Sequence, residues 1–66
     1  MMTKLAMHFN DQAHQVIDNV TAFWVDEKHV HVRTLFDDYP VEHSFNRKNI
    51  RLVFEVKDDD SKKRII

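Results

Sequence analysis

Residues 20–36 read VTAFWVDEKHVHVRTLF, and this stretch does more than any other to decide the fold. After its central DEK, Val30, Val32 and Phe36 alternate with His29, His31 and Arg33, and alternation with a period of two is typical of β-strands. A two-residue turn at Glu27 and Lys28 brings the two halves into an antiparallel pair. The stretch therefore predicts a β-hairpin with one mainly apolar side.

The two sides of this hairpin have different predicted roles. Phe23 faces Val32 on the side that we expect to line the core. The opposite side combines aromatic, aliphatic and cationic groups, a mixture that is typical of interface centres. This predicted interface consists of Val20, Trp24, His31, Arg33 and Leu35. The alternative is that another part of the same chain covers this side.

A second hairpin is predicted by the turn signal DDYP at residues 37–40. It sets Phe36 opposite Val41 and Thr34 opposite His43, so the apolar side of the first hairpin continues onto a third strand. In this register His43 points toward the core.

The regions that flank the two hairpins show the same alternation. Near the N-terminus it places Leu5, Met7 and Phe9 on one side, and near the C-terminus Leu52, Phe54 and Val56. The chain contains no glycine, so its turns must rely on Asn, Asp and Pro. The pattern predicts a mainly β fold, a small antiparallel sheet or open barrel of about five or six strands.

Residues 11–20 fit two structures. Ala13, Val16, Ile17 and Val20 have the spacing of one helix face, yet the segment is short for a helix and strands flank it. We expect a strand, with one short helix as the alternative.

The C-terminal segment differs in composition from the rest of the chain. From Lys57 the sequence KDDDSKKR has no apolar alternation. We therefore expect a single domain over residues 1–57 and a charged, disordered tail over residues 58–66, although Ile65 and Ile66 provide apolar groups that could dock on a neighbour.

Residues 16–56 resemble a group of small β-rich proteins of unknown function from Gram-positive bacteria and their prophages. The resemblance is carried by IDNVTAFWVDEKHVHVRTLF and EHSFNRKNIRLVFEV, in which a turn after a strand leads into a hairpin and then into the last strand. It implies an all-β domain with no known chemistry.

The amino-acid composition excludes several classes of function. The chain has 66 residues, no cysteine and a formal net charge of −1. Without cysteine there is no disulfide framework, so a cytoplasmic location is expected. Without glycine the phosphate-binding loops and the nucleophile elbow are excluded. No apolar run approaches the length that crosses a bilayer, so we expect no contact with a membrane.

Few residues are placed for chemistry. His29 and His31 project from the same side of a strand, with Asp26 or His43 as further ligands, but two histidines fall short of a usual zinc site. Ser44 and the adjacent His43 point to opposite faces of a strand and cannot act as nucleophile and base. We therefore expect no metal, no cofactor and no enzymatic activity.

The sequence thus favours a small binding or interaction module. Its expected partner is a second copy of the chain or a larger protein to which it is an accessory. The alternative function is binding of single-stranded nucleic acid, with bases stacked on Trp24 or Tyr39 beside nearby cations. Acidic residues interleave with those cations, so nucleic acid is the less favoured partner.

Overall fold

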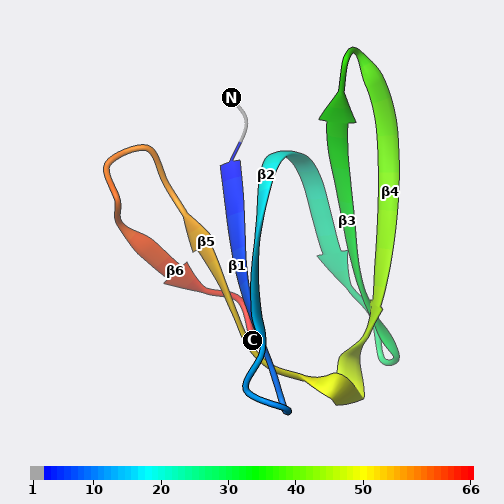
Figure 1. Ribbon diagram of the computed structural model, residues 1–66, viewed down its shortest axis with the longest axis vertical. Helices are drawn as coiled ribbons and strands as arrows, with labels where there is room; N and C mark the ends of the chain where they lie inside the picture. The colour runs from blue at the N-terminus through cyan, green and yellow to red at the C-terminus, as the bar shows by residue number, and fades with distance from the viewer. Residues whose placement is uncertain (1–2) are drawn as a thin grey trace.

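Six antiparallel strands form one open sheet in the computed structural model, which describes residues 3–66 (Figure 1). The elements are β1 (Thr3–Phe9), β2 (His14–Val25), β3 (His29–Phe36), β4 (Tyr39–Asn46), the 3₁₀ turn η1 (Arg47–Asn49), β5 (Ile50–Val56) and β6 (Lys62–Arg64). Their order across the sheet is β4-β3-β2-β1-β5-β6. The mainly β fold is confirmed, and the alternative of a helix within residues 11–20 is wrong because β2 occupies most of that segment.

The sheet bends at the middle of β2, which pairs with β1 along its first half and with β3 along its second half. Asn19 adopts a positive φ of 58° there, and the register with β3 shifts between Val20 and Ala22. Such bulges bend a strand and increase its twist. The shift sets Val20 opposite Thr34. Val20 is consequently only 1% exposed and belongs to the core, so its place in the predicted interface is wrong.

The bend encloses a small apolar core on the inner side of the sheet. Phe9 of β1 and Phe45 of β4 show the closure, since their ring centroids lie 6.2 Å apart although their strands are not neighbours. The buried apolar residues are Leu5, Met7, Ile17, Val20, Val30, Val32, Ile50 and Val53. The inward alternation predicted for β1 and for the first part of β3 is therefore confirmed.

The turn between β3 and β4 is tighter than the sequence suggested. Asp37 and Asp38 both have positive φ, 47° and 66°, as the central residues of a type I′ turn require. Phe36 therefore pairs directly with Tyr39, and the register is displaced by two residues from the prediction. Because the displacement is even, the faces are preserved. His43 faces Val32 rather than Thr34, and it is exposed, so its expected burial is wrong.

The alternation predicted for β5 is out of phase. Val53 is fully buried, whereas Leu52 and Phe54 lie on the opposite side and are only partly buried. The register with β1 shifts between His8 and Phe9, which adds one residue to β5 after Ile50. Both Ile50 and Val53 then reach the core across this irregularity.

The prediction of a disordered tail is wrong for its last residues. Lys62–Arg64 form β6 along β5, and Ile65 and Ile66 pack against the core. The acidic run makes the turn: Asp60 has a φ of 64°, and the Asp59 carboxylate accepts hydrogen bonds from the Ser61 hydroxyl and backbone N–H. These bonds lower the pKa of Asp59. Local hydrogen bonding by aspartate and serine thus orders a segment that composition alone assigns to solvent.

Candidate functional site

The predicted interface is assembled on the outer face of β2 and β3, apart from Val20. The Trp24 indole is 40% exposed, stacks on the His31 ring with centroids 5.1 Å apart, and lies 5.6 Å from the Arg33 guanidinium carbon. Arg33 also donates to the Glu42 carboxylate at 3.3 Å. Leu35 is partly buried on the same face. The charged and aromatic groups of this face therefore already engage one another.

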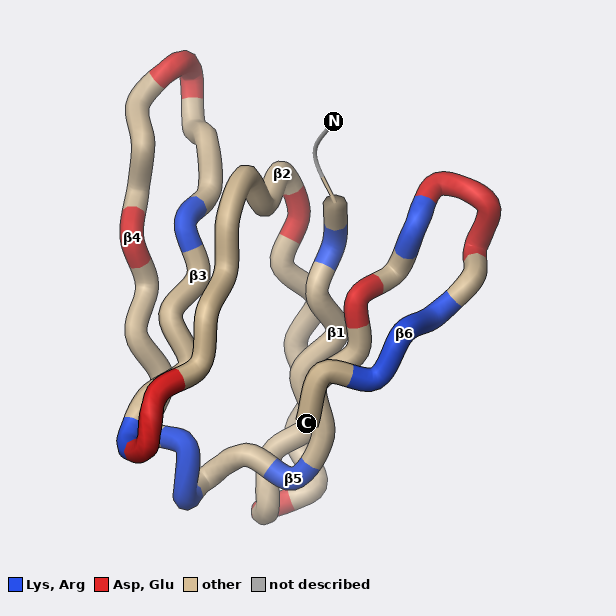
Figure 2. The backbone as a smooth tube through the Cα atoms, turned by 180° about the vertical axis from the view of Figure 1, so that it is seen from behind, with Lys and Arg blue, Asp and Glu red and all other residues tan. Residues whose placement is uncertain are grey.

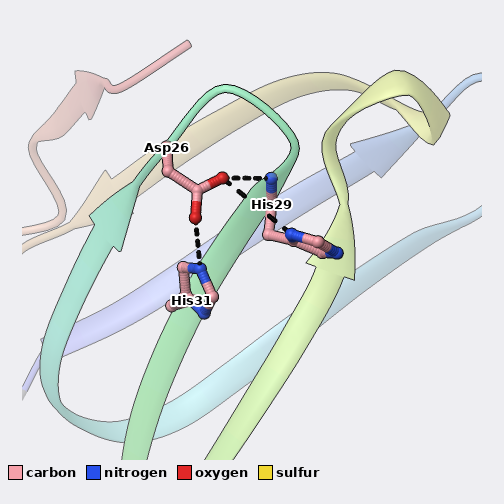
Figure 3. A group of neighbouring side chains, drawn as sticks. All are labelled: Asp26, His29 and His31. Atoms are coloured by element: carbon pink, nitrogen blue, oxygen red, sulfur yellow. Dashed lines mark hydrogen bonds and ion pairs between the residues drawn. The ribbon is translucent and has the colours of Figure 1, made fainter.

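A polar cluster lies at the β2–β3 turn, next to Trp24 (Figure 3). Asp26 Oδ1 accepts hydrogen bonds from the backbone N–H groups of Lys28 at 2.8 Å and His29 at 2.6 Å. Its Oδ2 accepts a hydrogen bond from His31 Nε2 at 2.8 Å. The hydrogen bond with His31, followed by the two backbone bonds, holds the Asp26 pKa well below its ordinary value. The carboxylate thus fixes the turn and orients His31.

His31 is held from three directions. Its Nδ1 lies 3.1 Å from Ser44 Oγ, its Nε2 contacts Asp26, and its ring stacks on Trp24. Ser44 faces His31 directly in the β3–β4 ladder. The predicted register set Asn46 opposite His31, so the contribution of Ser44 was missed. Recognising Asp37 and Asp38 as a two-residue turn would have found it.

Ser44, His31 and Asp26 follow the hydrogen-bonding order of a catalytic triad. A triad also needs donors aimed at the developing oxyanion and a cleft that holds substrate. The hollow that Ser44 lines, together with Phe9 and Phe45, does not include His31. Ser44 Oγ and Asp26 Oδ2 thus hold the His31 imidazole at both of its ring nitrogens.

A second exposed surface, which the sequence did not suggest, lies at the free end of the β3–β4 hairpin. Phe36 is 69% exposed, Tyr39 73% and Val41 37%. Tyr39 is opposite Phe36, and Val41 follows on the same side of β4, so the three side chains form one patch on the inner face of the sheet. We call this group the hairpin patch. The β3–β4 hairpin extends past the β1–β2 part of the sheet (Figure 1), and the three side chains of the patch are exposed.

Known proteins provide no guide to the site. Comparisons of the chain with family models, with curated proteins and with solved structures found no match. The resemblance to small prophage proteins therefore stays a prediction. Within residues 3–66, no helix has the length and apolarity needed to cross a membrane.

Proposed function

We propose that the protein is a small binding module that associates with a second copy of itself along β4. The observation that carries this proposal is the combination of a free eight-residue edge strand with the hairpin patch beside it. An unpaired edge strand is a template for another strand, and large exposed apolar side chains are typical of association surfaces.

The hydrogen-bonding geometry of β4 suits such pairing. The two-residue turn makes Phe36 and Tyr39 a hydrogen-bonded pair, and these pairs alternate along an antiparallel ladder. The backbone groups of Glu42, Ser44 and Asn46 consequently face away from β3. Pro40, which lacks an N–H, also has its nitrogen on that outward side, where proline is tolerated in an edge strand. Three consecutive outward positions thus offer both donors and acceptors.

A two-fold axis across β4 would also cover the hairpin patch. Antiparallel pairing runs the two copies of β4 in opposite directions, which sets Tyr39 and Val41 near the partner's Phe45 and the partner's His43. All four positions lie on the inner face of the sheet. A self-complementary contact of this kind closes a dimer without leaving a free edge at β4.

Association through the Trp24 side of the sheet and binding of single-stranded nucleic acid are less well supported. The Trp24 side of the sheet has its cation and its aromatic rings engaged within the chain, as described above. Single-stranded nucleic acid requires aromatic rings within a basic groove, whereas Glu42 pairs with Arg33 near Trp24, and Asp37 and Asp38 separate Phe36 from Tyr39. The absence of cysteine supports a cytoplasmic location for the module.

Sedimentation equilibrium over a concentration series tests the proposal with a matched pair of variants. Glu42→Pro removes an outward N–H and leaves the β3–β4 ladder intact, so we expect the dimer to be lost. Glu42→Gln removes the same charge and the ion pair with Arg33 but keeps the N–H, so we expect the dimer to remain. Circular dichroism of both variants serves to check that they fold.

Two outcomes would overturn the proposal. A wild type that stays monomeric at millimolar concentration shows that the edge does not pair. A dimer that survives in Glu42→Pro but is lost in Trp24→Ala places the contact on the Trp24 side. Salt-dependent binding of a generic oligonucleotide by the monomer would instead favour the nucleic-acid function.

A further inference from the structure

We propose that Asp26, His29 and His31 form a binding site for a divalent transition-metal ion, with imidazole and carboxylate as its ligands. The potential ligand atoms of the three side chains all lie within 4.8 Å of one another. They come from a single turn and the strand that follows it, and in Figure 3 each imidazole has one nitrogen next to the Asp26 carboxylate. Imidazole with a carboxylate suits zinc, copper and nickel.

The distances between ligand atoms fit an ion of this size. A tetrahedral ion with bonds of about 2.0–2.1 Å holds neighbouring ligand atoms roughly 3.3 Å apart. His31 Nε2 lies 2.8 Å from Asp26 Oδ2, and His29 Nδ1 lies 3.9 Å from Asp26 Oδ1. The two distances involve different carboxylate oxygens, and one lies below and the other above this value, so small rotations of the Asp26 and His29 side chains are needed to place one oxygen and both nitrogens around an ion. The His29 side chain is 46% exposed, so it can rotate toward the ion without disturbing the core.

His31 already has the surroundings of a metal ligand. A ligating imidazole usually gives its second ring nitrogen to a hydrogen-bonding partner, which fixes its tautomer and orientation. Ser44 Oγ occupies that position, 3.1 Å from Nδ1. When an ion replaces the hydrogen bond between Nε2 and Asp26, Nε2 releases its proton to solvent and Nδ1–H donates to Ser44 Oγ. Stacking on Trp24 restricts rotation of the ring, and the His31 side chain is only 18% exposed. The most important ligand is therefore oriented before the ion arrives.

The site is open on its solvent side. Asp26 and His29 are about half exposed, so an ion can enter and water can complete its coordination. Three protein ligands with water in the remaining position are the pattern of accessible metal centres rather than of closed structural ones. None of the three ligands lies on the outward edge of β4 or in the hairpin patch. Ser44 contacts His31 through its hydroxyl and would join the dimer only through its backbone, so the inference does not require the dimer.

Titration of the full chain with ZnCl₂ in a calorimeter tests the site, with Cu²⁺ quenching of tryptophan fluorescence as a second readout. Trp24 is the only tryptophan and stacks on His31, so a bound Cu²⁺ should quench it. We expect one ion per chain. His29→Gln and His31→Gln should abolish saturable binding, and Ser44→Ala should weaken it by about tenfold because it removes the partner of Nδ1.

A matched control uses the other pair of neighbouring histidines, His8 and His14, whose ring centroids lie 5.8 Å apart. The double variant His8→Gln, His14→Gln should bind Zn²⁺ as the wild type does. Glu42→Pro should also bind normally, which separates this inference from the dimer. No saturable binding by the folded wild type, or binding that survives His31→Gln but is lost in the His8 and His14 variant, would overturn the site.

Discussion

The two edges of the sheet are built in opposite ways (Figure 2). β6 is three residues long, and all three are cations, Lys62–Arg64. β4 is eight residues long and carries a single carboxylate, Glu42, among residues that include Pro40, Val41 and Phe45. A short edge with like charges resists pairing with another strand, whereas a long and weakly charged edge invites it.

The difference shows what each edge does for the fold. β6 covers β5 and brings Ile65 and Ile66 onto the core, so its strand ends the sheet. β4 leaves outward backbone groups unpaired and the hairpin patch exposed. We infer that β6 protects the sheet and β4 extends it, and the following predictions test this contrast.

Deletion of residues 62–66 should have the largest effect. It removes β6 and uncovers the core that Ile65 and Ile66 contact. The free energy of unfolding should fall by about 2–4 kcal/mol, measured by urea denaturation, as for loss of large aliphatic side chains from a core. The seven-residue β5 then becomes an edge, so sedimentation should also detect larger species.

Lys63→Ser is the control for the deletion, because it changes the charge of β6 and keeps both isoleucines. It should alter the free energy of unfolding by less than about 0.5 kcal/mol. Equal stability of the deleted and complete chains would show that β6 and the isoleucines contribute nothing to the core.

Replacement of both Phe36 and Tyr39 by serine should have the next largest effect, on association. Both side chains are exposed in the monomer, so the change acts mainly on the dimer. We expect dimerisation to weaken by at least about tenfold, or about 1.4 kcal/mol. Trp24→Ala, an exposed aromatic on the opposite face, should change it by less than about threefold. The reverse ranking by sedimentation would move the interface to the Trp24 side.

Acid should weaken the β2–β3 turn and the β5–β6 turn to different extents. Asp26 and Asp59 both have a lowered pKa in the folded protein, through hydrogen bonds from His31 and Ser61 respectively and from backbone N–H groups. A lowered folded pKa contributes stability above the ordinary pKa of 3.8, and that contribution is lost as pH falls through the folded value. Stability should therefore decline below about pH 4.

Asparagine variants separate the two contributions to the acid response. Asp26→Asn should flatten the dependence of the melting temperature on pH more than Asp59→Asn, because the Asp26 pKa is lowered further. An acid response that neither variant alters would assign it to other carboxylates.

Much of the fold follows from local pattern. Period-two alternation is a direct consequence of strand geometry, and it located β1 and β3, while the turn at Glu27 and Lys28 gave the correct pairing of Phe23 with Val32. Without glycine, the chain places Asn or Asp at most positions with positive φ, as turn chemistry requires. These signals depend only on neighbours in sequence.

The predictions of which side chains face the core fail where one extra residue shifts the alternation of a strand. The bulge at Val20 directs that side chain into the core. The irregularity after Ile50 exchanges the inward and outward side chains of β5 relative to the prediction. A bulge depends on the partner strand, so alternation within one strand does not reveal it. The prediction of the candidate site failed for a similar reason. The β3–β4 turn has two central residues and not four, so Ser44 lies opposite His31 and Phe36 lies opposite Tyr39, where both are exposed.

Amide hydrogen exchange of the wild type, measured by NMR at low and high protein concentration, tests the central claim most directly. The outward N–H groups of Glu42, Ser44 and Asn46 should exchange freely in the monomer and become protected as concentration rises, because pairing of two β4 strands gives them acceptors. Val41 and His43, whose N–H groups face β3, serve as internal references that are protected throughout. Outward amides that exchange freely at every concentration, in a sample that sediments as a dimer, would contradict pairing along β4.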